Sequence, residues 1–193
     1  MTEAVEQGKY KHLVFNYNGV VEDRWKLPEE GTVRLDTDGS VNNQGRAAGG
    51  GVVRDHQGYW KVGFQRKLGY MPSTAAELTS LLTGLRLCKQ YKYQRVVAYT
   101  DSTETIQLLM QDGGPQHPYW AEIEEIRELI YSDWDVKIRH APRETIRCAD
   151  FLARMAHNLM EEYCVWTNPP TGCLNQLGLD SAQPNMVMAD RSS

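Results

Sequence analysis

Alternation of apolar and polar residues with a period of two marks the strands of this chain. In residues 33–38, with the sequence VRLDTD, charged side chains occupy every second position, so they point to one strand face and the remaining side chains to the other. Gly39 then frees the backbone to turn, which leaves the carboxylate of Asp38 at the strand end. β-Forming residues predict further strands near 52–53 and at 59–64, 95–100 and 136–139.

Apolar residues spaced three or four apart predict the helices. The strongest such pattern runs from about Thr74 to Tyr91. Glu77 lies at the edge of its apolar stripe, where a carboxylate would be partly buried, but Thr74 and Glu77 also have the spacing of an N-terminal capping box. Similar patterns predict helices at about 102–111, 119–130 and 145–163.

The order of these elements is three strands, a helix, a strand, two helices, a strand and a helix. It predicts an α/β fold with a five-stranded mixed sheet, three strands antiparallel and two parallel, flanked by helices. A right-handed crossover would make the first and fourth strands neighbours, so Asp38 and Asp101 would emerge side by side. The glycines at 49–51 are unusual in a strand and indicate either the close approach of another backbone or a bulge.

One domain accounts for the patterned part of the chain, which we place at residues 25–163. Residues 1–24 are polar and mixed in charge, and we expect a weakly ordered N-terminal arm. The segment from Trp25 to Gly31 reads as a turn that leads into the first strand. Beyond Cys164 the periodicity vanishes, so residues 164–193 are predicted to be a disordered tail.

Composition narrows the function classes. A chain of 193 residues with 41% hydrophobic residues is globular, and a net charge of −4 gives no overall basic field for nucleic acid. That balance argues against a tight nucleic-acid binder but leaves room for an enzyme with a local basic groove. The 4 cysteines form no C-x-x-C pair, which disfavours zinc and fits reduced intracellular thiols. No apolar run approaches membrane-spanning length, and no signal-peptide pattern opens the sequence.

Four acids stand where the predicted elements begin or end. Taken singly, each has an ordinary structural explanation. Asp38 fits an Asp-Gly turn, Glu77 and Asp101 fit helix caps, and helical phase alone would leave Asp150 exposed. Taken together, carboxylates at one sheet edge would raise each other's pKa unless a counter-charge is present, and a hard divalent cation such as magnesium or manganese supplies one. We interpret Asp36 as structural and Glu104 as a cap for the helix after Asp101.

The sequence around these acids resembles type 1 ribonuclease H. The shared motifs are DGS at 38–40, AEL at 76–78, TDS at 100–102 and a histidine ten residues before Asp150. The sequence between these motifs resembles the ribonuclease H-like domains at the C-terminal end of plant non-LTR reverse transcriptases, and their free-standing relatives. It comprises WKLPEEG at 25–31, GGVVRDHQGYWKVGF at 50–64 and HAPRE at 140–144.

This resemblance implies a ribonuclease H-like fold and cleavage of the RNA strand of RNA–DNA hybrids with two Mg²⁺ ions, for which Mn²⁺ can substitute. It implies that Asp38 bridges both ions and that Asp150 helps to hold the ion that activates water. Glu77 and Asp101 would hold the ion at the leaving 3′ oxygen. His140 corresponds to a mobile histidine that assists proton transfer and product release.

The sequence also offers candidate substrate contacts, and it departs from the family at two places. Candidate substrate contacts are Gly39, Ser40, Asn42, Asn43, Gln44, Ser73 and Thr74. Ile146 replaces an asparagine usual in relatives, and the GGP at 113–115 leaves no room for a lysine-rich substrate handle. We expect a monomeric hybrid endonuclease in the nucleus or cytoplasm, without membrane association. The competing hypothesis is a domesticated nucleic-acid-binding module with weak or lost turnover.

Overall fold

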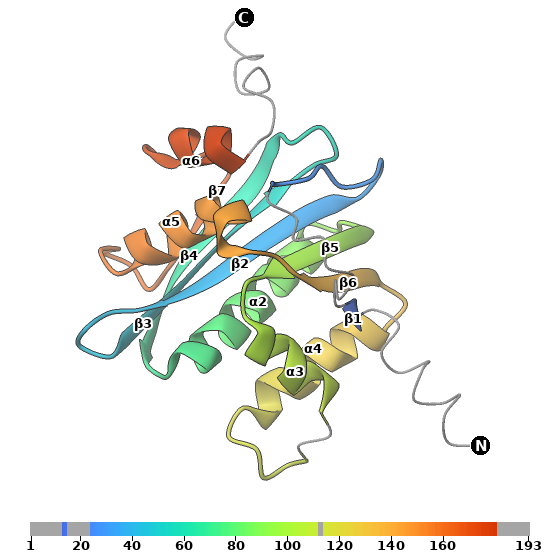
Figure 1. Cartoon of the computed structure of the whole chain (residues 1–193), viewed down its shortest axis with the longest axis vertical. Coiled ribbons are helices and arrows are strands. Elements are labelled where there is room, and N and C mark those ends of the chain that lie inside the picture. Colours follow the sequence, from blue (N-terminus) through green and yellow to red (C-terminus); the bar gives the residue numbers. More distant parts are fainter. Residues whose placement is uncertain (1–12, 15–23, 112–113, 181–193) are drawn as a thin grey trace, which may run out of the picture.

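The computed structural model describes residues 13–14, 24–111 and 114–180 of the chain, built around one sheet (Figure 1). Its strands are β1 (Leu13–Val14), β2 (Val33–Val41), β3 (Arg46–Arg54), β4 (Trp60–Tyr70), β5 (Arg95–Thr100), β6 (Asp135–His140) and β7 (Tyr163–Trp166). The helices are α2 (Ser73–Gln90), α3 (Thr103–Met110), α4 (Trp120–Tyr131), the 3₁₀ turn η1 (Arg143–Thr145), α5 (Arg147–Ala156) and α6 (Cys173–Asp180).

The strand order of the sheet is β1-β6-β5-β2-β3-β4-β7. β2, β3 and β4 form an antiparallel meander, whereas β5 pairs parallel with β2 and β6 pairs parallel with β5. The five predicted strands, their directions and the adjacency of the first and fourth are therefore confirmed. β1 and β7 extend the predicted five-stranded sheet at its two edges, which makes it seven-stranded.

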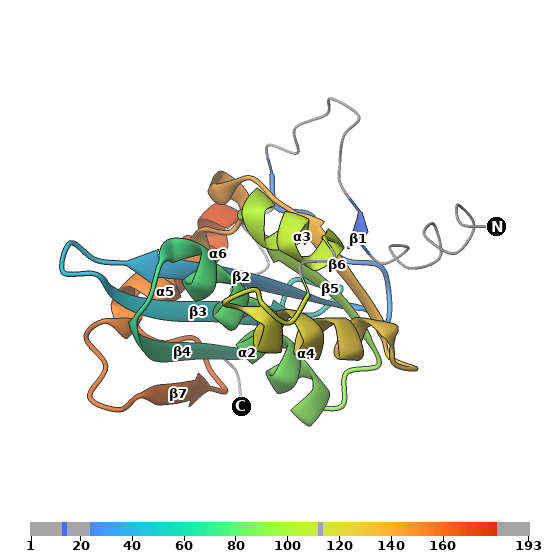
Figure 2. The same ribbon diagram turned by 90° about the horizontal axis from the view of Figure 1, so that it is seen from below.

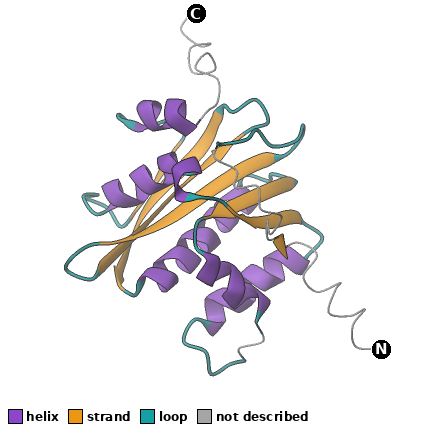
Figure 3. Cartoon of the chain, viewed as in Figure 1, coloured by secondary structure: helices purple, strands orange, loops and turns teal. Residues whose placement is uncertain are grey.

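Two layers of helices cover the two faces of this sheet, as Figures 2 and 3 show. Val53 points into the main core, which β2, β4, β5 and β6 share with the apolar sides of α2, α3 and α4. Its neighbour Val52 points to the opposite face and packs with Cys148 and Leu152 of α5. Successive side chains of a strand point to opposite faces, so one set fills a large core and the other set a smaller one.

A close backbone approach explains the glycine at the centre of β3. A Cβ atom added at Gly50 would lie 2.3 Å from the amide nitrogen of Ala153 and 2.6 Å from the carbonyl carbon of Leu152. Both atoms belong to the backbone of α5, which cannot move aside without leaving the sheet. Of the two explanations open for the glycines at 49–51, close approach is the one that applies at Gly50.

Gly50→Ala is therefore expected to destabilise the fold by at least about 3 kcal/mol, because overpacking here must displace a helix rather than a side chain. Urea unfolding monitored by circular dichroism would measure the change. Gly178→Ala is the matched control, since a Cβ there meets nothing within 4 Å and alanine favours a helix. Equal stability of the two variants would show that α5 does not pack on β3 as closely as described.

The C-terminal region differs from its prediction. The last helix of the predicted domain ends at Ala156 rather than near residue 163, because the chain turns back to place β7 beside β4. Residues 164–180, predicted to be disordered, contain most of β7 and all of α6. Cys173 and Leu177 of α6 are buried against α5. A four-residue strand and an eight-residue helix are too short to show periodicity; residues 181–193 lie outside the described part.

The expected N-terminal arm lies mostly outside the described residues. Leu13 and Val14 form β1, which pairs in parallel with Ile138 and Arg139 of β6. None of the helices in the described part of the chain has the length and apolar character that crossing a bilayer requires.

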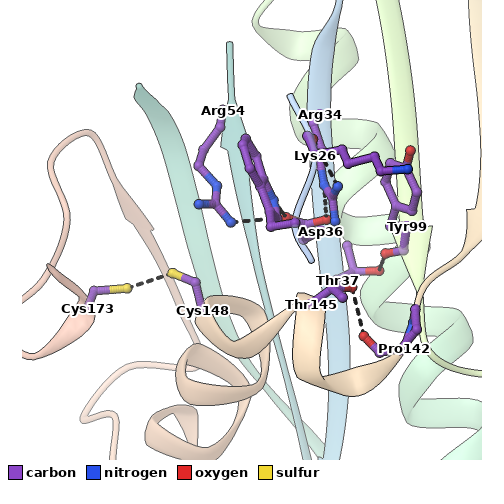
Figure 4. Close-up of polar contacts among 11 residues, drawn as sticks. Lys26, Arg34, Asp36, Thr37, Arg54, Tyr99, Pro142, Thr145, Cys148 and Cys173 are labelled. Carbon is purple, nitrogen blue, oxygen red and sulfur yellow. Dashed lines mark hydrogen bonds and ion pairs between the residues drawn. The ribbon is translucent and has the colours of Figure 1, made fainter. Parts of the chain in front are cut away.

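A buried charge cluster on the α5 side of the sheet holds β2 to β3. The carboxylate of Asp36 accepts hydrogen bonds from Arg34 Nε at 2.7 Å, Arg54 Nη2 at 3.3 Å and Trp25 Nε1 at 2.9 Å. Figure 4 shows the guanidinium groups of Arg34 and Arg54 pointing toward Asp36. The structural interpretation of Asp36 agrees with these contacts, while Trp25, expected only in a turn, is the 4%-exposed lid of the cluster.

Candidate active site

Asp38 lies near the end of β2, two residues after Asp36 on the same face of the strand. Gly39 follows it because the strand runs directly against the first turn of α2. A Cβ at Gly39 would lie 2.6 Å from the amide nitrogen of Glu77. This contact brings the side chains of Asp38 and Glu77 to the same place, although they are 39 positions apart in the sequence.

Three of the four predicted acids form one cluster. A carboxylate oxygen from each of Asp38, Glu77 and Asp101 lies within 4.8 Å of the other two. β2 supplies Asp38, α2 supplies Glu77, and Asp101 directly follows β5, the parallel neighbour of β2. Asp38 Oδ2 and Glu77 Oε2 are buried and have no hydrogen-bond partner. A cluster of carboxylates with unpartnered buried oxygens fits a hard divalent cation, whose preferred ligands are oxygens.

The electrostatics of the cluster follow from burial. Burial, followed by the charges of Asp101 and Asp150, raises the pKa of Asp38 to about 8. Burial, followed by the charges of Asp38 and Asp101, raises the pKa of Glu77 to about 9. Burial also raises the pKa of Asp101, against the opposing effect of Arg143 and His140. The metal-free cluster therefore retains protons at neutral pH, and a cation that binds there must displace them.

Asp150 lies beside the cluster but has other partners. Its Oδ2 is 2.8 Å from Arg154 Nη2, and its Oδ1 accepts a hydrogen bond from Arg143 Nη2. The side chain is 12% exposed, so the expectation from helical phase that it is solvated is wrong. Its charge nevertheless contributes to the raised pKa values of Asp38 and Asp101, which places it within electrostatic reach of the cluster.

His140 ends β6 at the same edge of the sheet, where β6 pairs with β5. Its Nε2 lies 3.1 Å from the backbone carbonyl oxygen of Asp101, so this nitrogen donates if the hydrogen bond is formed. The following loop turns through η1 into α5 at Ile146, which is fully buried with Tyr99 and Ala141. The side chain of Ile146 packs against the sheet and provides no capping hydrogen bond for α5.

The candidate substrate contacts fall at two places. Ser40, Asn42, Asn43 and Gln44 lie along the β2–β3 hairpin, where Asn43 and Gln44 are exposed. Asn42 has a structural role, because its Oδ1 accepts hydrogen bonds from the backbone amides of Gln44 and Arg46, at 3.0 Å each. Ser40 Oγ lies 3.1 Å from His157 Nε2, a contact that fixes the hairpin base to the end of α5.

The second place is the start of α2. Ser73 is exposed, whereas Thr74 Oγ1 donates to Glu104 Oε2 of α3. Neither Thr74 nor Glu77 caps α2, which begins after Pro72 without a side-chain hydrogen bond, so the capping-box alternative for Glu77 is wrong. Ser102, not Asp101, caps α3 by accepting from the backbone amide of Thr105. Glu104 lies in the first turn of α3, but its carboxylate accepts from Thr74 of α2 and does not cap α3, so the interpretation of Glu104 as a cap is wrong.

Sequence reasoning missed the two arginines that hold Asp150. The spacing of four residues between Asp150 and Arg154 is that of a helical ion pair, so this contact had a signal in the sequence. Arg143 had none, because its approach to Asp150 depends on the 3₁₀ turn between β6 and α5.

The raised pKa values predict how the stability of the metal-free protein depends on pH. Asp38 and Glu77 have ordinary pKa values near 4 when unfolded and values of about 8 and 9 when folded. Their contribution to stability is therefore complete below about pH 4 and is lost as pH rises through the folded pKa values. The melting temperature in EDTA should fall over this window in wild type and fall less in Asp38→Asn. Parallel curves for the two proteins would contradict the prediction.

Comparison with known proteins agrees with this geometry. Residues 36–156 match the reverse transcriptase-like family. A protein of Arabidopsis thaliana with the name "Putative ribonuclease H protein" is 35% identical over 136 residues, which cover 70% of this chain and 22% of that protein. The chain thus spans about a fifth of the length of this curated relative.

Solved structures share the fold. Ribonuclease H1 of Halobacterium salinarum has a TM-score of 0.60 and 25% identity, and the match covers 66% of this chain and 98% of that one. The N-terminal ribonuclease H domain from Mycobacterium tuberculosis gives 0.59 at 21% identity, covering 66% and 94% of the two chains. A compost ribonuclease H1 in complex with an RNA/DNA hybrid gives 0.57 at 20% identity, covering 65% and 96%. By its sequence match and its fold, the chain belongs to the reverse transcriptase-like family of ribonuclease H-like domains.

Proposed function

We propose that this domain is a metal-dependent endonuclease that cleaves the RNA strand of RNA–DNA hybrids. The observation that carries the proposal is the cluster of Asp38, Glu77 and Asp101, in which Asp38 and Glu77 are buried and each has a carboxylate oxygen without a hydrogen-bond partner. Such a cluster has an energetic cost in the metal-free protein, because Asp38 and Glu77 are buried and the carboxylates of Asp38 and Asp101 repel their neighbours. A site that serves catalysis gives a reason for that cost, whereas a purely structural one does not.

The chain offers the ligands for two magnesium ions, which when bound supply an activated water and stabilise the attacking and leaving oxygens. Asp38, the most deeply buried acid of the cluster, would be shared between them. Glu77 and Asp101 would complete one site. Asp150 would serve the other once its carboxylate exchanges one of its two arginine partners for the cation.

The residues around the acids would handle protons and negative charge. If His140 Nε2 donates to the carbonyl of Asp101, Nδ1 of the same ring is left as an acceptor that can take up a proton. Arg143 has a side chain that is 62% exposed, so it can turn toward a phosphate when Asp150 releases it. Both groups would act beside the cluster, where their charges also favour the ionised form of Asp101.

A local basic groove beside the cluster suits a nucleic-acid strand. A hollow of about 560 Å³ has three basic side chains in its lining, Arg46, Arg66 and Lys67, against one acid, Glu162, and His157 lines it as well. His157 also contacts Ser40, two residues from Asp38, so this groove adjoins the acids. The exposed amides of the β2–β3 hairpin can donate to or accept from the 2′-hydroxyl groups that distinguish RNA from DNA. These features offset the acidic net charge of the chain locally.

The test is digestion of an end-labelled RNA–DNA hybrid with magnesium, beside single-stranded RNA, duplex RNA and duplex DNA of the same sequence. We expect cleavage of the RNA strand of the hybrid alone, abolished by EDTA and by Asp101→Asn. Binding of hybrid without cleavage at any magnesium or manganese concentration would favour the binding-module hypothesis. Equal cleavage of all four substrates would contradict hybrid specificity.

A further inference from the structure

Two cysteines outside the candidate active site face each other across the interface between α5 and α6. Cys148 Sγ lies 2.9 Å from Cys173 Sγ, and both side chains are fully buried. The two residues are 25 positions apart in the sequence, so the fold rather than chain proximity brings them together. Figure 4 shows the two sulfur atoms directed at each other, with Cys148 on the α5 side.

The residues packed around the two cysteines hold their sulfur atoms in place. Both belong to the small core that contains Val52, Leu152 and Leu177, with Phe151 packed against it. Cys173 begins α6, and its backbone amide donates to the carbonyl of Pro170 at 3.0 Å, which fixes the entry into that helix. Sulfur atoms in a disulfide are about 2.05 Å apart, so the pair needs to close by only about 0.9 Å. This is a small displacement for two cysteine side chains that already face each other.

We propose that Cys148 and Cys173 are a disulfide-forming pair that cross-links α6 to α5 when the protein meets a small-molecule disulfide. One thiolate attacks the oxidant's sulfur–sulfur bond, forms a mixed disulfide and releases one thiol. The second cysteine then attacks the mixed disulfide and releases the other thiol. The protein loses two protons and two electrons, and the oxidant is reduced to two thiols.

The position of the pair determines what the cross-link would do. α6 has eight residues, and in the described part of the chain its buried side chains belong to the small core and not to the main one. Such an element opens at a lower free energy than the sheet, and this local opening gives an oxidant access to the buried thiols. The disulfide would then remove that opening and hold β7 and α6 to the domain.

Incubation of the full chain with oxidised glutathione, without denaturant, tests the proposal. Free thiols are then alkylated under unfolding conditions, and peptides are mapped by mass spectrometry without reduction. We expect a linked peptide containing Cys148 and Cys173, lighter by two hydrogen atoms than the two free peptides together. Cys88, buried in the main core, should remain alkylatable. Recovery of both Cys148 and Cys173 in alkylated form, while the half-buried Cys164 carries glutathione, would overturn the proposal.

A second readout separates a specific pair from general oxidation. A protease cut between residues 157 and 172 should leave fragments that stay joined in the oxidised protein and separate after reduction. Cys164→Ala should leave this behaviour unchanged, whereas Cys173→Ala should abolish it. If Cys173→Ala does not fold, the wild-type peptide map decides alone. Cross-links from Cys148 to Cys88 or Cys164 in similar yield would also overturn the proposal.

Discussion

Asp38→Asn is expected to lower the rate of hybrid cleavage by at least about 10³-fold, because metal ions in such sites contribute several kcal/mol to transition-state stabilisation and about 1.4 kcal/mol corresponds to a tenfold change in rate. The substitution is nearly isosteric and removes a charge from the centre of the cluster. Asp38 is 1% exposed and interacts with both Glu77 and Asp101. Single-turnover cleavage of a labelled hybrid at saturating magnesium measures the effect on chemistry alone.

The Asp38→Asn variant should fold, and its metal-free form should be more stable than the metal-free wild type. The variant removes a buried acid whose ionised form is disfavoured, so the melting temperature in EDTA at pH 8 should exceed that of wild type. Glu128→Gln, an exposed acid on α4, is the matched control and should change neither rate nor stability measurably. If Asp38→Asn cleaved hybrid at the wild-type rate, the assignment of Asp38 to a metal site would be wrong, even if the domain still bound hybrid.

The sequence allowed much of the site to be predicted, because the acids stand at element boundaries. The parallel pairing of β2 with β5 follows from a right-handed crossover, and it places Asp101 beside Asp38. Glu77 was harder, since a capping box and a buried ligand share one spacing. Its burial depends on Gly39, which allows α2 to approach the end of β2. That contact is a tertiary property, and no local pattern contains it.

Asp150 shows where helical phase fails. Helical phase alone would leave this side chain exposed. Its low exposure comes from Arg143 and Arg154, which close over the carboxylate from two sides. Long charged side chains cover neighbouring surface with their apolar stems, and periodicity takes no account of this.

The C-terminal region was mispredicted for a different reason. β7 is stabilised by its pairing with β4, and α6 by its packing on α5. Neither element has enough residues to bury an apolar face of its own, so neither is apparent before the rest of the fold exists. The same reasoning applies to Trp25, which reads as part of a turn until Arg34, Asp36 and Arg54 are assembled beneath it.

Asp36→Asn is expected to destabilise the domain by about 3–5 kcal/mol, the usual cost of removing one partner from a buried ion pair. Two buried guanidinium groups share this carboxylate, so both would lose the counter-charge that it supplies. The aromatic rings that stack on them, with Arg34 Cζ 4.0 Å from the Tyr99 ring centre and Arg54 Cζ 4.0 Å from that of Trp25, offset only part of this cost. The new amide nitrogen would also face a donor in either orientation: Arg34 at the Oδ1 position, or both Arg54 and Trp25 at the Oδ2 position.

A surface pair of the same chemistry provides the control. Asp135 Oδ2 lies 3.5 Å from Arg95 Nε, and both side chains are nearly half exposed. Asp135→Asn should therefore cost less than about 1 kcal/mol, because solvent screens the charge that remains. Urea unfolding of wild type and both variants at one pH gives the two differences directly. Similar losses for Asp36→Asn and Asp135→Asn would mean that water reaches the cluster, and that Trp25 does not seal it.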